Sequence, residues 1–304
     1  MGKPIVLHLG DDIRWNHELY AKFSEQFEVR RSYSLPRPDF IRALQDRKFG
    51  DFVAIAGAGF DWVDTASLAK RGIIYCNAAA ACTESVADAA LWLVISTFRL
   101  FSWSAMAART ADVDKFVAAN RNLAMVSQNP KGHTLGIIGF GQIGRRAAEK
   151  AYKALRHEHP LSRSRQDAAT AGRYAPRGVR LRGGGDSVQR RDSVGRLTSI
   201  EAEARSSDRE YCPGKLLDET ALIDALKSGQ LSAAGLDVHF NEPQVNRELA
   251  AMKNVEVMSH NAGASLDSHI GFERLGMENI LSFQQTGKAL TPVNAQLVAK
   301  AYKL

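Results

Sequence analysis

Residues 133–155 read HTLGIIGFGQIGRRAAEKAYKAL, in which an apolar run leads into a glycine turn and helix-forming residues follow directly. The three glycines of the turn have separate tasks. Gly139 permits the tight bend, Gly141 lets the backbone approach a pyrophosphate, and Gly144 allows close packing of helix on strand. The positive end of the helix then faces the anion. We therefore expect a strand–turn–helix unit that binds a dinucleotide, with a plain tight turn as the alternative, through Gly139, Phe140, Gly141, Gln142, Ile143 and Gly144.

Apolar strand patterns alternate with amphipathic helix patterns on both sides of this unit, which is typical of an α/β protein with a parallel, doubly wound sheet. The strand at 51–55 meets the next glycine loop with no crossover helix between them. The helix at 84–109 is expected to be an interdomain and dimer-contact element, or an ordinary core helix. The expected strands lie at 4–10, 27–33, 51–55, 230–238 and 254–263. The expected helices lie at 17–27, 39–50, 84–109, 218–229 and 268–287, residues 56–78 read as turn, helix and strand, and the residues after 287 read as a tail.

The composition is that of a soluble globular protein. The chain has 304 residues, 45% of them hydrophobic and 24% charged, enough for two domains of ordinary size. Its three cysteines have no metal-site spacing, which argues against a disulfide framework or a metal and suits a reducing compartment. We recognise no signal peptide, and no apolar run approaching the ~20 residues of a membrane span. The sequence therefore predicts a cytoplasmic protein with no membrane partner.

The formal charge of +7 is concentrated in one segment rather than spread over the chain. Residues 156–213 hold 12 Arg and 8 acidic residues, a net of +4, whereas the rest holds 28 basic and 25 acidic residues, a net of +3. A basic RNA-binding segment is one interpretation, since RGVRLRGGG faintly resembles an RGG tract. The segment lacks interleaved aromatic residues and carries many acids, so we expect no nucleic-acid partner.

Three polar residues follow two expected strands near the C-terminal end of the chain. Asp237 ends the strand at 230–238, Glu242 lies in the loop after it, and His260 ends the strand at 254–263. Carboxyl ends of strands in an open α/β sheet face the ligand crevice, so these side chains are expected to converge. A carboxylate raises the pKa of a neighbouring imidazole and orients it, which favours an acid–base role toward a ketone. A hydrogen-bonded structural histidine is the alternative.

Five stretches together resemble the D-isomer-specific 2-hydroxyacid dehydrogenases, especially the fungal branch of the glyoxylate/hydroxypyruvate reductase and D-mandelate dehydrogenase type. They span nearly the whole chain except residues 156–213. The stretches are AGAGFDWVD (56–64), TESVADAALWLVISTFR (83–99), GHTLGIIGFGQIG (132–144), KLLDETALIDALKSGQLSAAGLDVHFNEP (215–243) and NVEVMSHNAGA (254–264).

The resemblance implies a two-domain fold, with a Rossmann-type NAD(P)-binding domain at 84–273 inserted into a flavodoxin-like substrate domain built from 1–83 and 274–304. It implies hydride transfer between NAD or NADP and a small 2-keto or D-2-hydroxy acid, in a homodimer. The acidic or basic residue that distinguishes the two cofactors cannot be identified, because residues after Leu155 show no strand pattern.

The resemblance also implies a role for each site residue. His260 would exchange the proton and Glu242 would tune it. Asp237 would lie on the nicotinamide side of the cofactor, Thr83 would line the cofactor cleft, and Gly263 would lie at the cofactor site. Backbone amides would hold the substrate carboxylate at Ala58 and Gly59.

At one catalytic position of the family this chain has a different kind of residue. The family has an Arg in an N-x-ARG motif before the helix that here reads LLDETALIDAL, and Pro213 stands in its place. Proline offers neither charge nor donor, so the loss of a contact aimed at the reacting oxygen is expected to cost roughly 10³-fold in rate. We therefore expect the chain to be impaired, and a dinucleotide-binding pseudoenzyme is the alternative function.

Residues 156–213 lack the pattern of a buried sheet strand. They contain 12 Arg and no Lys, and only seven Val, Ile or Leu residues. Our hypothesis is an out-of-frame translation of a GC-rich gene, with a lost stretch at Ile55–Ala56, so that central strands of the cofactor domain are missing. A genuine disordered, arginine-rich insertion is the alternative. The other reading frames of the transcript test the hypothesis, because one of them should restore an ARG motif and apolar strands.

Overall fold

The protein is described from a computed structural model. The described residues are 3–9, 11–32, 39, 42, 52–54, 57, 59–60, 63–131, 133, 135, 141–155, 195–199 and 217–302. The chain divides into two compact units, Met1–Cys82 with Ala264–Leu304, and Thr83–Gly263. The segment that begins at Ala264 contains the whole of helix α11 (Leu266–Thr286).

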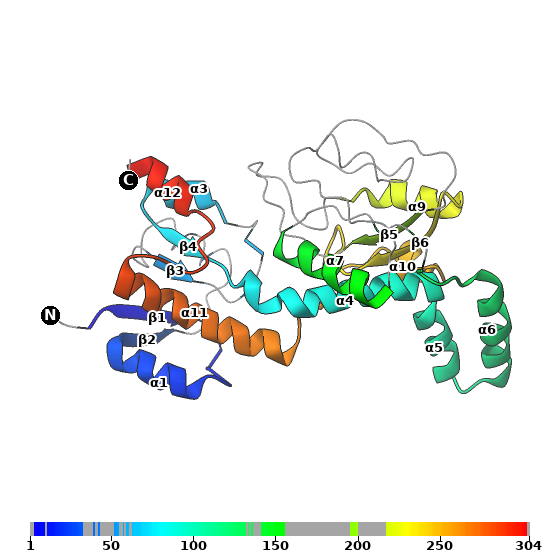
Figure 1. Cartoon of the computed structure of the whole chain (residues 1–304), viewed down its shortest axis with the longest axis horizontal. Helices are drawn as coiled ribbons and strands as arrows, with labels where there is room; N and C mark the ends of the chain where they lie inside the picture. Colours follow the sequence, from blue (N-terminus) through cyan, green and yellow to red (C-terminus); the bar gives the residue numbers. More distant parts are fainter. Residues whose placement is uncertain are drawn as a thin grey trace. The chain divides into compact units, whose positions relative to one another are not determined.

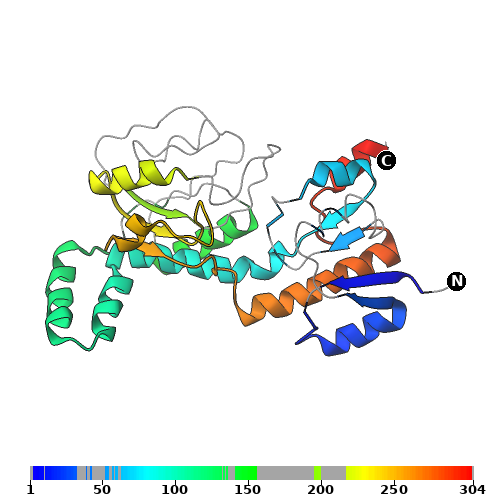
Figure 2. The same ribbon diagram turned by 180° about the vertical axis from the view of Figure 1, so that it is seen from behind.

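The first unit contains two pairs of parallel strands. Strand β1 (Ile5–Leu9) pairs with β2 (Glu28–Ser32), and helix α1 (His17–Gln26) connects them. Helix α11 lies beside this pair, as both views show (Figure 1 and Figure 2). The three buried residues at the centre of this contact are Phe23, Phe27 and Met277.

The second strand pair is bound to the C-terminal end of the chain. Strand β3 (Phe52–Ala54) pairs with β4 (Ile74–Cys76), and α3 (Thr65–Lys70) precedes β4. Buried Asn294 accepts from the N–H of Tyr75 at 2.9 Å and donates to the carbonyl of Ile73 at 2.9 Å. Helix α12 (Ala295–Tyr302) follows directly, so the expectation of a simple tail after residue 287 is wrong.

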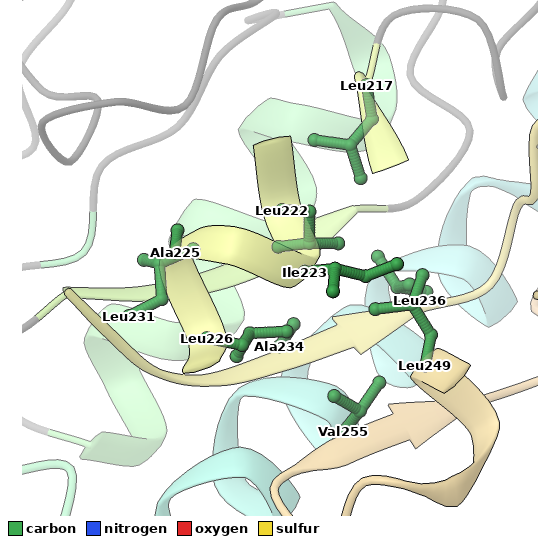
Figure 3. Packing of buried hydrophobic residues seen from close by; sticks show 10 residues of the cluster. All are labelled: Leu217, Leu222, Ile223, Ala225, Leu226, Leu231, Ala234, Leu236, Leu249 and Val255. Carbon is green, nitrogen blue, oxygen red and sulfur yellow. The ribbon is translucent and has the colours of Figure 1, made fainter. Parts of the chain in front are cut away.

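The second unit is built around a parallel sheet of order β5-β6-β7. Strand β6 (Leu231–Leu236) is central and pairs with β5 (Gly195–Ser199) and β7 (Val255–Val257). Helices α9 (Glu219–Lys227) and α10 (Arg247–Ala251) pack their apolar side chains onto it. Figure 3 shows this core, which includes Leu222, Ile223, Leu226, Leu231, Leu236, Leu249 and Val255.

Strand β5 corrects the expectation that the arginine-rich segment contributes no strand. Its sequence, GRLTS, has one apolar side chain, yet it runs parallel to β6 with Leu197 opposite Ala234. Strand pairing depends on backbone N–H and C=O groups, and these are independent of side-chain type. The remainder of 156–213, including Pro213, lies outside the described residues, as do Ile55 and Ala56 and most of the expected helix at 39–50.

Helix α4 (Ala79–Arg99) packs against the sheet of the second unit. A Cβ added to Gly235 of β6 would lie 3.2 Å from Leu93, so glycine permits the close approach. Ser96 donates to buried Glu256 of β7 at 2.7 Å. By length and composition alone α4 would suffice to cross a membrane, contrary to the expectation that no apolar run approaches that length. Its hydrogen bond to buried Glu256 and its close packing on Gly235 are those of a core helix.

The expectation of a single helix at 84–109 is wrong, because the helix is interrupted at Leu100. That residue adopts φ 51 and ψ 41, a left-handed conformation that costs a non-glycine residue roughly 1–2 kcal/mol. Helix α5 (Phe101–Arg109) then begins, and α6 (Val113–Val126) returns beside it as a hairpin that the sequence analysis did not predict.

Candidate active site

The ends of β6 and β7 bring the candidate catalytic residues together. Asp237 follows the last residue of β6, and His260 lies three residues after the end of β7. The N–H of His260 donates to the carbonyl of Asp237 at 2.9 Å. His260 adopts φ 54, in the left-handed region that residues other than glycine rarely occupy. This bend directs the chain back toward the β6 end.

His260 and Glu242 form a hydrogen-bonded pair. Nδ1 of His260 lies 2.6 Å from Oε2 of Glu242, and the two side chains are 37% and 33% exposed. Their positions after two neighbouring strands predicted that these two residues meet, and the structure brings them together. Because Glu242 engages Nδ1, proton exchange with a substrate would take place at the other ring nitrogen, Nε2.

Asp237 organises the backbone beneath this pair. It is 1% exposed, and its carboxylate accepts from the N–H groups of Asn261 at 3.0 Å and Ala262 at 3.2 Å. A buried carboxylate needs such donors, because leaving it unpaired in the interior is costly. In the described chain Asp237 therefore holds the turn that carries His260, and Gly263 follows that turn.

His239 connects the two strand ends and was missed by the sequence analysis. Its backbone N–H donates to Oε1 of Glu242 at 2.9 Å, and its Nε2 lies 2.7 Å from the carbonyl of Met258. The side chain is 5% exposed. Its position between Asp237 and Glu242 was the available signal, but only the fold brings Met258, 19 residues later, within reach.

The environment keeps Glu242 ionised. Partial burial raises the pKa of its carboxyl, but the hydrogen bonds from His260 and from the backbone of His239 lower it more, so the net pKa lies below the usual value. An anionic Glu242 fixes the imidazole orientation and stabilises its protonated form. This arrangement suits general acid–base chemistry at His260 Nε2.

The glycine turn ends where α7 (Gln142–Leu155) begins. The first intrahelical bond of α7 runs from the N–H of Arg145 to the carbonyl of Gly141 at 3.1 Å, so the three preceding amides have no acceptor within the helix. Ile143 and Gly144 are buried, as close packing of this helix requires. The first-turn amides fit a dinucleotide pyrophosphate. Gly139 and Phe140 lie outside the described residues.

The remaining expected residues are distributed over both units. Thr83 lies in α4 at the start of the second unit and is partly buried, whereas Gly59 belongs to the first unit. Ala58 lies outside the described residues. The substrate-binding role of Ala58 and Gly59 stays a prediction.

Comparison with known proteins supports the same chemistry. Residues 211–262 match the sequence profile of the D-isomer specific 2-hydroxyacid dehydrogenase, NAD binding domain. The apo crystal structure of D-mandelate dehydrogenase from Rhodotorula graminis is 30% identical, covers 96% of this chain and 98% of its own, and superposes with a TM-score of 0.74. Glyoxylate reductase 1 of Saccharomyces cerevisiae is 28% identical over 96% of this chain and 95% of its own length.

A further relative, dehydrogenase efuE of Hormonema carpetanum, is 31% identical over 82% of this chain, and the chain spans 63% of its length. With a parallel sheet, a glycine turn and an acid-paired histidine, the fold and site define a nicotinamide-dependent oxidoreductase. The chain belongs to the D-isomer-specific 2-hydroxyacid dehydrogenases, which confirms the expected family, the expected fold class and the use of NAD or NADP.

Proposed function

We propose that the protein interconverts a small 2-keto acid and the corresponding D-2-hydroxy acid, with NAD or NADP as the hydride carrier. The observation that carries this proposal is the 2.6 Å contact between His260 and Glu242 at the ends of adjacent strands. The named activities of the relatives, glyoxylate reductase and D-mandelate dehydrogenase, are of this class.

In the proposed reaction each residue of the site has one task. When bound, the reduced nicotinamide supplies a hydride to the carbonyl carbon of the keto acid. His260 Nε2 delivers a proton to the carbonyl oxygen, and Glu242 stabilises the imidazolium before that transfer. Asp237 keeps the backbone of the His260 turn in register. In the reverse direction the neutral imidazole accepts the hydroxyl proton.

Cofactor and substrate contacts are assigned to separate elements. The amides of Gly141 to Gly144 and the preceding Gly139 and Phe140 would bind the pyrophosphate. Asp237 would lie on the nicotinamide side, Thr83 would line the cofactor cleft, and Gly263 would lie at the cofactor site. Backbone amides at Ala58 and Gly59 would hold the substrate carboxylate. These roles rest on the family resemblance and on the first-turn amides of α7.

Pro213 lowers the expected rate. The family's arginine at this position would contact both the carboxylate and the keto oxygen. Proline offers neither contact, so we expect a lower turnover from this chain. This single position favours the second candidate function, a dinucleotide-binding protein without turnover.

The test separates these two functions. Purified protein is assayed for oxidation of NADH and NADPH with glyoxylate, hydroxypyruvate and phenylglyoxylate, and cofactor binding is followed by ligand-observed NMR. Reduction that is lost in His260→Gln supports the dehydrogenase. Cofactor binding without any reduction establishes the pseudoenzyme, and absence of both overturns the proposal.

We further propose a cytoplasmic homodimer that pairs through the α5–α6 hairpin. Apolar side chains on this hairpin are exposed to solvent, which is unusual for a monomer surface when they are grouped. Light scattering of the intact protein tests the assembly, and charged substitutions at Met106 and Met125 should yield monomers. The most exposed of these side chains are Met106 at 69%, Val113 at 75%, Phe116 at 56% and Met125 at 83%.

A further inference from the structure

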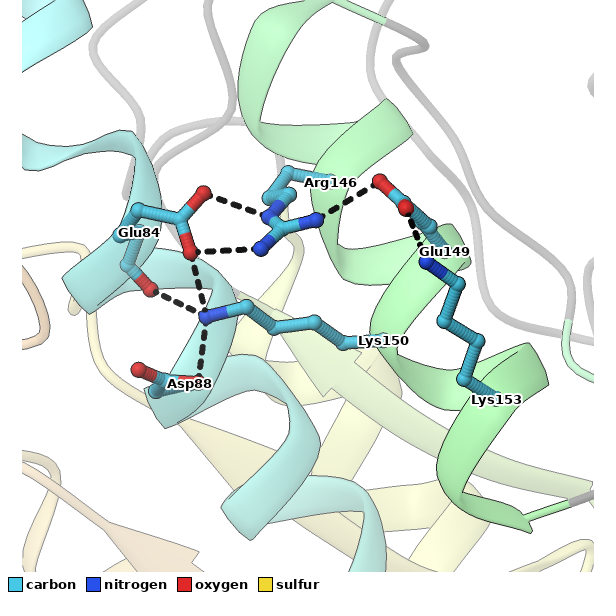
Figure 4. A network of polar contacts seen from close by, with 6 residues as sticks. All are labelled: Glu84, Asp88, Arg146, Glu149, Lys150 and Lys153. Atoms are coloured by element: carbon cyan, nitrogen blue, oxygen red, sulfur yellow. Dashed lines mark hydrogen bonds and ion pairs between the residues drawn. The ribbon is translucent and has the colours of Figure 1, made fainter.

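Charged side chains of α4 and α7 form a network of ion pairs and hydrogen bonds (Figure 4). Arg146 contacts Glu84 through two nitrogens, with Nε 2.5 Å from Oε1 and Nη2 3.0 Å from Oε2. Lys150 lies 2.9 Å from Oε2 of Glu84 and 2.5 Å from Oδ1 of Asp88. We call Glu84, Asp88, Arg146 and Lys150 the α4–α7 clamp.

The clamp joins segments that are far apart in sequence. Glu84 and Arg146 are separated by 62 residues, and each of the two basic side chains contacts α4 from a successive turn of α7. Lys150 also donates to the backbone carbonyl of Glu84 at 3.2 Å, and its side chain is only 16% exposed. Within α7, Glu149 contacts Arg146 at 2.7 Å and Lys153 at 2.6 Å, so Arg146 is paired with both helices.

The clamp lies next to the residues proposed to hold the cofactor. Glu84 directly follows Thr83, and Arg146 lies two residues after Gly144, the last glycine of the turn. Arg145 and Arg146 are both in the first turns of α7, where the helix dipole disfavours cations. Glu84 supplies a compensating negative charge at Arg146, as does Glu149 of α7. Hydrogen bonds from Arg146 and Lys150 lower the pKa of the Glu84 carboxyl to about 2.

A role in overall stability alone does not account for this arrangement. Partly exposed ion pairs each contribute little to the free energy of unfolding. Binding of a pyrophosphate by backbone amides, by contrast, depends strongly on geometry, because small displacements of positioned groups have large effects on binding and rate. The Glu84 carboxylate contacts Arg146 through two nitrogens and also contacts Lys150. Together these contacts restrict both the axial position and the rotation of α7.

We propose that the α4–α7 clamp positions the first turn of α7 for pyrophosphate binding, with Glu84 and Arg146 as positioning residues. The inference rests on the proposed dinucleotide site and adds to it the residues that hold that site in place. Neither side chain needs to touch the cofactor for this role.

The test compares Glu84→Gln with a matched control, Glu248→Gln. The control removes one carboxylate from another ion pair between helices, that of Lys227 in α9 with Glu248 in α10. Dissociation constants are measured by ligand-observed NMR for NADH, NADPH, ADP-ribose and adenosine. Arg146→Lys keeps the charge but loses the forked contact, so it provides a second variant should Glu84→Gln not fold.

We expect Glu84→Gln and Arg146→Lys to raise the dissociation constants of the three pyrophosphate-containing ligands by about threefold to tenfold. The dissociation constant of adenosine should rise by less than about twofold. The control variant Glu248→Gln should leave the dissociation constants of the pyrophosphate-containing ligands and of adenosine unchanged. In the double variant Glu84→Gln with Arg146→Lys, the loss of binding free energy should be less than the sum of the two single losses. In a turnover assay the cofactor KM should rise while kcat is retained.

Three outcomes would overturn the inference. An equal loss of affinity for adenosine and for ADP-ribose would indicate a general structural effect. The same conclusion would follow if Glu248→Gln reduced the affinity for ADP-ribose as much as the clamp variants do. Unchanged ADP-ribose affinity in both clamp variants would remove the positioning role and leave the dinucleotide site intact. If the unaltered protein binds none of the pyrophosphate ligands, the proposed function fails together with this inference.

Discussion

Replacement of Glu242 by Gln is the most direct perturbation of the proposed catalytic pair. Glutamine keeps an oxygen that accepts the His239 N–H, which is 2.9 Å from Oε1 in the unaltered protein. It removes the negative charge that faces His260 Nδ1 at 2.6 Å. The substitution therefore leaves the loop in place and removes the electrostatic support of the imidazolium.

The expected loss follows from the strength of this contact. A hydrogen bond to a charged group contributes about 1.5–3 kcal/mol, and the partial exposure of both side chains favours the lower half of this range. About 2 kcal/mol of lost transition-state stabilisation corresponds to roughly a 30-fold decrease in kcat/KM. Removal of the neighbouring negative charge also shifts the titration of the His260 ring to lower pH.

Two measurements check this prediction. Initial rates of 2-keto acid reduction give kcat/KM across pH, and NMR of the imidazole protons gives the titration of His260. Glu219→Gln is a suitable control, because Glu219 accepts from the N–H of Phe240 at 3.1 Å in the same loop. The reasoning is refuted if Glu242→Gln retains kcat/KM within about twofold of the control with an unchanged His260 titration.

Three further outcomes are expected. A Cβ on Gly271 would lie 2.8 Å from that of Ala81, so Gly271→Ala should lower the free energy of unfolding by about 1–3 kcal/mol in urea titrations. A Cβ on Gly276 would have nothing within 4 Å, so Gly276→Ala should raise the free energy of unfolding by about 0.5–1 kcal/mol. Burial raises the pKa of Glu273, but hydrogen bonds from the backbone of residues 14–16 and the Asn16 side chain lower it more. The stability that this carboxylate contributes is therefore present at neutral pH and lost as pH falls through its depressed pKa, and Glu273→Gln should flatten the acid limb of thermal denaturation. Pro213→Arg should raise keto-acid reduction by about tenfold or more in steady-state assays, and an unchanged rate would show that this position does not limit turnover.

The pairing of Glu242 with His260 was predictable from sequence because it follows from topology. Both residues come after apolar strands, and parallel strands that are neighbours in a sheet present their carboxyl ends at one edge. The cap of α9 is similarly local, since Asp218 accepts from the N–H groups of Thr220 and Ala221 within three residues.

Features that depend on distant partners were not predictable. The apolar pattern of 84–109 continues across Leu100 with neither glycine nor proline, so the helix break leaves no trace in the periodicity. Strand β5 has no apolar run, and its pairing with β6 depends on backbone groups. The sequence around His239 does not indicate that its ring will contact the backbone carbonyl of Met258.

The α/β class, the glycine turn before α7 and the acid–base pair could be inferred from residue order alone, because each is encoded in short-range periodicity or in residue type at a strand end. The charges that hold α7 against α4, and the carboxylate that secures the His260 turn, became evident only from the folded chain. Those contacts join residues such as Glu84 and Arg146 that are remote along the chain, and local pattern carries no information about which remote side chains will share a surface.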